Sequence, residues 1–294
     1  MESILQSLIS GIVVGSIYAL IALGFVLIYK ATAVINFAQG ELMMFGAYLC
    51  LTLIVVLKIP FWLAFLATLA AAALMGFTLE RLFLRPMIGE PAISIIMLTI
   101  GLASFLKGVL HVIWGSETLV YPAIFSADPL RLGPIVVSQV YVYSVFFAGL
   151  CLVLFNLFFR FSLAGIAMRA VANDQQAAQS MGISIRKVFA IAWAIAAIVA
   201  SVGGILLGNI NGVNASLSTF GLKVFPAVIL GGLDSIPGAI LGGFIIGMLE
   251  ALSGIYLDPL IEGGSKEVVP FIVLVVVLMI KPYGLFGTEE IEKV

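Results

Sequence analysis

A single carboxylate stands inside one of the most apolar stretches of the sequence. Glu250 lies within GAILGGFIIGMLEALSGIYL, residues 238–257. A charged group inside a membrane helix is costly, so such residues face the interior of a helix bundle or water. Two roles are open at this point: Glu250 is a pathway or gating residue, or it is a protonated or paired carboxyl that locks two helices together.

A second polar interruption, Asn-Phe-Ala-Gln-Gly-Glu at residues 36–41, separates two apolar segments. Many transporters handle solutes with a broken helix whose exposed backbone lines a cavity at mid-depth. Asn36, Gln39 and Glu41 are therefore candidates, with Glu250, for the translocation pathway. A simple turn at the membrane surface is the alternative for this stretch.

The other polar residues in apolar surroundings are weaker candidates. Lys107 and His111 lie four residues apart, on one face of a helix. A lone histidine in this setting is more often a hydrogen-bonded packing residue than a ligand. Three asparagines follow an apolar run and either line a solute entrance or belong to an ordinary loop: Asn209, Asn211 and Asn214.

Several kinds of chemistry are excluded by what the sequence lacks. It has no G-x-x-x-x-G-K-[ST] phosphate loop, so we expect no ATP hydrolysis by this chain, and no H-E-x-x-H motif. Cys50 and Cys151 lie in apolar runs and are expected to be buried hydrophobes, with no metal site and no cofactor. One histidine in total leaves little for proton relays, and a net charge of −1 gives no reason to expect nucleic acid as a partner.

The composition sets the class of protein to which these residues belong. The 294 residues are 63% hydrophobic and 10% charged, with a mean hydropathy of +1.24. No soluble domain can bury that much apolar surface, and only helices satisfy their own backbone in lipid, so the sequence predicts an all-α, polytopic membrane helix bundle.

The arrangement of apolar runs predicts about 8–10 transmembrane helices in one domain, residues 1–294. At about twenty residues per span, nine are expected, near 5–29, 41–57, 61–82, 93–113, 140–159, 188–208, 216–233, 238–257 and 268–281. Glu2 is the only charge before the first apolar run, which argues for an uncleaved first span.

Lysine and arginine placement predicts the orientation. Basic residues gather in the loops around 81–85 and 160–187 and after the last span, which are all on one side if there are nine spans. The positive-inside rule makes that side cytoplasmic and puts the acidic turn at 258–267 outside.

Glycines recur at four-residue spacing, as in Gly11 and Gly15 or Gly243 and Gly247, which lets helix backbones approach closely.

The longest polar interval runs from Gly165 to Lys187, between two apolar runs long enough to cross a bilayer. Read as one helix, its apolar residues share a face: Leu163, Ile166, Ala167, Ala170, Ala177, Ala178 and Met181. Gly182 is expected to cap this helix and Ser184 to begin the next. We interpret the segment as a cytoplasmic helix that another protein grips; a solvated helix lying on lipid headgroups is the alternative.

Several short motifs, in this order along the chain, resemble those of the LivH-type permease, one of the two membrane subunits of branched-chain amino acid ABC importers. The motifs are Tyr18–Leu20 with Ala22–Gly24, Asn36–Glu41 with Leu42–Met44 and Gly46–Tyr48, Arg169–Ala170 with Ala177–Ala178 and Gly182–Ile183, Val228–Leu233 with Ser235, Pro237–Ala239, Gly242 and Glu250, and Lys281–Gly287. The resemblance covers nearly the whole chain. One departure is Gln39, where a histidine is frequent in the family.

The resemblance implies a role for the polar interval, which is similar to the EAA loop that couples ABC permeases to their ATPases. It places a coupling helix at about 162–185, with these contact residues: Arg169, Ala170, Asn173, Ala177, Ala178, Gly182 and Ile183. It further implies a second, related permease subunit, two ATP-binding subunits and a periplasmic solute-binding protein as partners. The chain would then lie in a bacterial-type inner membrane, in contact with lipid, and carry amino acids or a related small carboxylate or amide.

Two other classes of function remain open from the residues. A self-sufficient ion-coupled secondary transporter or channel would also lack a phosphate loop, but it has no need to present the polar helix. An intramembrane enzyme would have to use Glu250 or His111, and the sequence shows no nucleophile–base pair for it.

Overall fold

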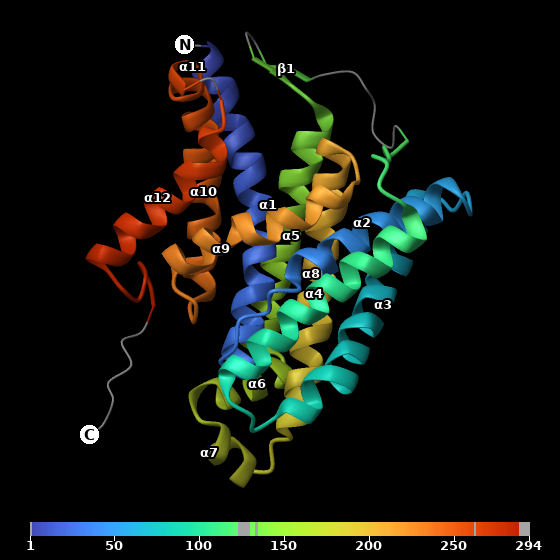
Figure 1. The fold of residues 1–294 in the computed structure, drawn as a ribbon, viewed down its shortest axis with the longest axis vertical. Coiled ribbons are helices and arrows are strands. Elements are labelled where there is room, and N and C mark those ends of the chain that lie inside the picture. The colour runs from blue at the N-terminus through green and yellow to red at the C-terminus, as the bar shows by residue number, and fades with distance from the viewer. Residues whose placement is uncertain (1, 123–129, 133–134, 262, 288–294) are drawn as a thin grey trace.

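The computed structural model describes residues 2–122, 130–132, 135–261 and 263–287 (Figure 1). Its described part is a bundle of helices: α1 Glu2–Thr32, α2 Gln39–Val55, α3 Phe61–Leu79, α4 Ala92–Trp114, α5 Gln139–Phe161, α6 Leu163–Asn173, α7 Gln175–Ser180, α8 Ile185–Asn211, α9 Thr219–Gly231, α10 Ile236–Tyr256, α11 Asp258–Ile261 and α12 Ser265–Ile280. Three shorter helical segments are η1 Glu80–Leu84, η2 Arg85–Met87 and η3 Ala215–Ser218. The all-α membrane fold is confirmed, with one small addition: strands β1 Leu130–Leu132 and β2 Ile135–Val137 pair antiparallel in the loop before α5.

Each of the nine predicted spans corresponds to a helix, but the helices differ in length. Within the described residues, six are long and apolar enough to cross a membrane, so the chain is a multi-pass membrane protein. The other three are shorter: α2 has 17 residues, α9 has 13 and α12 has 16. At 1.5 Å per residue, α9 is only about 20 Å long, less than the roughly 30 Å of a bilayer core.

The centre of the bundle is formed by α1 and α8, which are mostly buried. Glycines allow α1 to pack closely on α10, as the four-residue spacings suggested. A Cβ added at Gly247 would lie 2.4 Å from the Cα of Gly15, and one added at Gly11 would lie 3.0 Å from the Cα of Met248. The helix backbones themselves are therefore in contact along this pair.

The two ends of the bundle carry different segments. Figure 1 shows α6 and α7 at one end, and the N-terminus and α11 at the other. The polar interval and the acidic turn thus lie at opposite ends of the bundle, as their predicted placement on opposite sides of a membrane requires.

The closing motif Lys281–Gly287 folds back onto the end of α9. The backbone N–H of Leu285 donates to Leu230 O at 2.8 Å, and that of Phe286 donates to Gly231 O at 3.1 Å. Gly284 has φ +80°, which favours glycine at this turn. These residues of the motif thus stabilise the junction between α9 and α10.

Candidate functional site

The polar interruption at 36–41 is a turn inside the bundle, and its side chains bond to one another. Asn36 and Gln39 are fully buried. Asn36 Nδ2 donates to Gln39 Oε1 at 3.3 Å, and Asn36 Oδ1 accepts from the N–H of Ala38 at 3.0 Å. Gln39 Nε2 also donates to the carbonyl of Ala196 at 3.3 Å, near the middle of α8. The turn therefore lies about halfway along the bundle.

Two short helices, α2 and α9, contact each other near their N-terminal ends at this turn. Gly40, in the first turn of α2, packs against Ser218 and Gly221, where η3 continues into α9. A Cβ added at Gly40 would lie 2.2 Å from Ser218 O, and one added at Gly221 would lie 2.6 Å from the Cα of Gly40. The arrangement of two interrupted helices whose ends meet inside the membrane is typical of transporter binding regions.

Glu41 is the ionisable residue of this turn. It lies in the first turn of α2 and is 8% exposed. Lys107 on α4 is close enough to interact with it electrostatically. A carboxylate at a helix N-terminus is stabilised by the helix dipole. The start of α2 therefore positions Glu41 and balances part of its negative charge.

Glu250 bonds to a residue on another helix. Its Oε2 accepts a hydrogen bond from the hydroxyl of Tyr18 on α1 at 2.8 Å. The Tyr18 ring lies 6.4 Å from that of Phe220 on α9. The contact joins α1 and α10, as expected for a carboxyl that locks two helices, while Glu250 itself is only partly buried.

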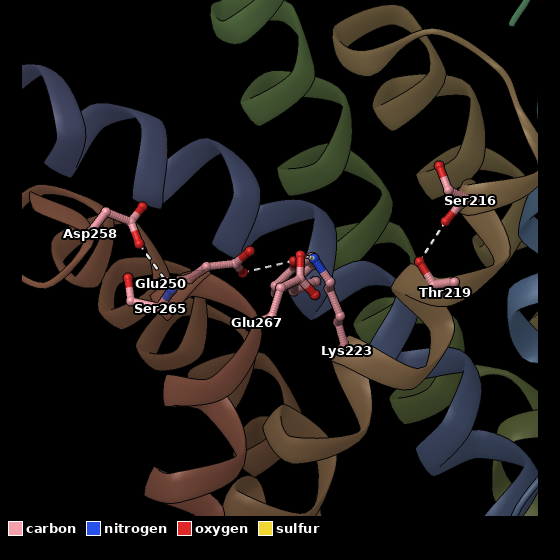
Figure 2. A network of polar contacts seen from close by, with 8 residues as sticks. Ser216, Thr219, Lys223, Glu250, Asp258, Ser265 and Glu267 are labelled. Atoms are coloured by element: carbon pink, nitrogen blue, oxygen red, sulfur yellow. Dashed lines mark hydrogen bonds and ion pairs between the residues drawn. The ribbon is translucent and has the colours of Figure 1, made fainter. Parts of the chain in front are cut away.

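A polar stripe formed by Ser216 of η3 and by Thr219 and Lys223 of α9 runs toward Glu250 (Figure 2). Their spacing of three and four residues puts them on one helix face. Thr219 Oγ1 donates to Ser216 O at 2.6 Å, and Lys223 forms an ion pair with Glu267 of α12. In this pair the lysine side chain is 15% exposed and the glutamate 62%.

The predicted pathway residues therefore lie in two places. Asn36, Gln39 and Glu41 come together at the α2 turn, whereas Glu250 belongs with Lys223, Tyr18 and Glu267. Sequence reasoning named none of these last three residues as a pathway residue. Two of them had a visible signal: Tyr18 begins a motif of the LivH-type family, and Lys223 is a lysine inside the apolar run at 216–233.

The other polar candidates make mostly local bonds, although Asn214 Nδ2 also donates to Thr118 Oγ1 at 3.3 Å. His111 Nδ1 lies 2.8 Å from the carbonyl of Lys107, as expected for a packing residue. Asn209 Nδ2 donates to Ile205 O at 3.3 Å, and Asn214 accepts from the N–H of Ser216 at 3.0 Å. In the described residues, no group of three or more metal-binding side chains comes together.

The polar interval 165–187 is divided into two helices, so the prediction of one continuous helix is wrong. Asp174 has an extended backbone, φ −157° and ψ 110°, which ends α6. Its Oδ1 then accepts from the N–H of Ala177 at 2.9 Å and caps α7. Asp is among the best N-cap residues, and this local bond outweighs continuation of the helix. Gly182 has φ +83° and Ser184 precedes α8, as predicted.

The predicted contact residues of this interval differ in exposure. Asn173, Ala177 and Gly182 are exposed, whereas Arg169, Ala170 and Ile183 are half-buried. Ala178 is buried, so its small side chain suits packing within the chain itself. Two large apolar side chains point outward instead: Leu163 is 86% exposed and Met181 is 83% exposed.

The fold and these features define a class: a multi-pass membrane protein with interrupted helices in its interior and a two-helix polar segment at one end. A sequence profile of the family described as "Branched-chain amino acid transport system / permease component" matches residues 7–278. The chain belongs to this family of membrane permeases.

Individual relatives match over almost their full length. The high-affinity branched-chain amino acid transport system permease protein LivH of Escherichia coli (strain K12) is 35% identical over 99% of this chain and 97% of its own. The corresponding protein BraD of Pseudomonas aeruginosa is 34% identical over 99% and 98%. A probable LivH of Methanocaldococcus jannaschii is 30% identical over 95% and 91%.

One solved structure shares the fold. It is described as PsaBC from Streptococcus pneumoniae in complex with Fab, and it superposes with a TM-score of 0.51 at 12% identity. The match covers 96% of this chain and 93% of that chain. At this identity the likeness concerns the arrangement of helices.

Proposed function

We propose that this chain is a permease subunit of an ATP-driven importer of branched-chain amino acids, or of a related small carboxylate or amide. The observation that carries the proposal is the match, over 99% of this chain, to relatives named as branched-chain amino acid permeases. The chain acts as a single transmembrane domain, residues 1–294, in a bacterial-type inner membrane. It needs no cofactor of its own.

The energy for transport comes from partners. The sequence has no phosphate loop, so two ATP-binding subunits hydrolyse ATP and act on this chain from the end that carries α6 and α7. A second, related permease subunit completes the pathway, and a periplasmic solute-binding protein delivers the substrate to the opposite end.

The coupling contact lies on α6 and α7. The exposed residues Asn173, Ala177 and Gly182 meet an ATP-binding subunit, with Met181 as an apolar anchor. Arg169, Ala170, Ala178 and Ile183 hold the two helices in position against the bundle. The cap at Asp174 fixes the angle between the helices, so movement of the ATP-binding subunits is transmitted to α5 and α8 at the ends of the segment.

The pathway follows the polar stripe and the α2 turn. An amino acid carries one ammonium and one carboxylate group at neutral pH. The side chains of Lys223 and Glu250 offer the two opposite charges on neighbouring helices, and the α2 turn with Asn36, Gln39 and Glu41 supplies polar groups halfway through the bundle. Most selectivity would still lie in the binding protein.

Reconstitution tests this function directly. The chain is placed in vesicles with its second permease and both ATP-binding subunits, with binding protein outside and ATP inside. We expect uptake of leucine that requires both ATP and the binding protein. Uptake by this chain alone, in ATP-free vesicles with an ion gradient, would instead establish an ion-coupled carrier.

Exchange of Glu250 for glutamine separates a pathway role from a helix lock. The glutamine still accepts the hydrogen bond from Tyr18, so we expect the thermal midpoint to change little. If the charge meets the substrate's ammonium group, leucine uptake falls by about tenfold or more, because a charge-assisted bond is worth roughly 1.5–3 kcal/mol.

Tyr18→Phe is the matched control for this exchange. It removes the hydroxyl that bonds to Glu250 and keeps the ring against Phe220, so we expect lower thermal stability with smaller loss of uptake. Normal uptake by Glu250→Gln would contradict the pathway role.

A further inference from the structure

A cavity of about 420 Å³ opens between the bundle and the polar two-helix segment. It is formed where α1 and α5 end, where α10 begins, and beside α6. Its polar lining consists mainly of Lys30, Arg160, Arg169, Asp234 and Ser235, and Phe286 adds an aromatic wall. None of these residues belongs to the translocation pathway described above, and three of them are cations: Lys30, Arg160 and Arg169.

The charges in the cavity are unbalanced. Among the described residues that line it, three cations face one carboxylate, and the ammonium of Lys30 donates to the backbone carbonyl of Asp234 at 2.7 Å. Arg160 lies 5.4 Å from the centroid of the Phe161 ring, and Arg169 lies 5.8 Å from that of Phe159. A cation–π contact uses the face of a guanidinium group, whereas its N–H donors lie in the plane of the group and can bind an anion.

The N-terminal end of α10 strengthens the attraction of the cavity for an anion. This helix has 21 residues, and Ser235 caps it by accepting from the N–H of Gly238 at 3.1 Å. Its positive dipole end opens into the same cavity as the two guanidinium groups. Guanidinium groups and a helix N-terminus together suit phosphate, whose oxygens accept several hydrogen bonds at once.

We propose that this cavity binds the phosphate of an anionic phospholipid headgroup in the leaflet at this end of the bundle. Lys30 and Arg160 lie in the last turns of two membrane helices, which is the depth of the headgroups. Phe161, 68% exposed, and Leu163 lie beside Arg160 and offer an apolar surface for acyl chains. The bound lipid bridges α6 to the ends of α1 and α5, because Arg169 of α6 and the other two cations contact one phosphate.

The test measures lipid retention and stability, and so is independent of transport. The full-length chain, in the complex in which it purifies, is depleted of lipid and then exposed to micelles containing phosphatidylglycerol or phosphatidylcholine. We expect phosphatidylglycerol to remain bound in native mass spectrometry and to raise the thermal midpoint, and phosphatidylcholine to do neither. Inorganic phosphate alone is a further arm; if it stabilises the protein as much as the lipid does, the site takes free phosphate.

Variants assign the binding to this cavity. Arg160→Gln with Arg169→Gln should weaken phosphatidylglycerol binding by about tenfold or more, because each cation near a headgroup contributes several-fold. Arg81→Gln, an exposed cation at the same end, should bind as the unaltered protein does. If the glutamine variant does not fold, a variant with both Arg160→Lys and Arg169→Lys is measured in its place. This variant keeps both charges, so we expect it to retain phosphatidylglycerol binding. Equal lipid retention by the glutamine variant and the unaltered protein would overturn the proposal, as would loss of retention in Arg81→Gln to the same extent.

Discussion

Replacing Ala177 with arginine should abolish ATP-dependent uptake while leaving the protein folded in the membrane. Ala177 is exposed in the first turn of α7, and its hydrogen bonds are made by the backbone: its N–H donates to Asp174 Oδ1 and its carbonyl accepts from the N–H of Met181. In the complex, a large charged side chain would be buried without a partner against the ATP-binding subunit. Such a charge costs about 2–5 kcal/mol, which weakens the subunit contact by about 30-fold or more.

Co-purification of the ATP-binding subunits measures this loss, and Ala177→Ser is the matched control because serine keeps the small size. We expect the serine variant to retain the subunits and the arginine variant to lose them. Full retention by both variants would show that α7 is not the coupling contact.

Replacing Gly247 with alanine should prevent α1 and α10 from packing, although it adds only one methyl group. The new Cβ would lie 2.4 Å from both the N and the Cα of Gly15, and these backbone atoms cannot move without shifting a whole helix. We expect a loss of roughly 3 kcal/mol or more in the free energy of unfolding, at the upper end of overpacking effects. The thermal midpoint and the yield of folded protein in detergent measure it.

Gly149→Ala in α5 is the matched control. Nothing lies within 4 Å of a Cβ added there, so the same methyl group meets no neighbour. Alanine also has the higher helix propensity, so we expect this variant to be as stable as the unaltered protein or slightly more so. Equal destabilisation by the two changes would mean that close backbone packing is not the cause.

The helices could be predicted from the sequence because lipid imposes a strong constraint: each long apolar run must be helical. The lengths of α9 and α12 could not be predicted, because an apolar run has the same sequence pattern whether its helix crosses the membrane or ends inside the bundle. The glycine pairs were visible, but sequence alone does not say that Gly15 meets Gly247 and not another glycine.

The site was predictable only in part, for a similar reason. The polar turn at Asn36 and Gln39 and the acid Glu250 were visible as interruptions of apolar runs. Their separation into two places depends on which helices pack together. The break at Asp174 was missed because periodicity continues across it, while the decisive bond, from Ala177 to the Asp174 carboxylate, is local and competes with the helix.

The meeting of α2 and α9 at Gly40 and Gly221 has an electrostatic consequence. Both helices present their N-terminal ends at this point, and each end carries the equivalent of about half a positive charge. Together the two ends amount to about one positive charge, which balances the Glu41 carboxylate in the first turn of α2. The negative charge of Glu41 is therefore compensated inside the bundle by the backbone itself, without a bound cation.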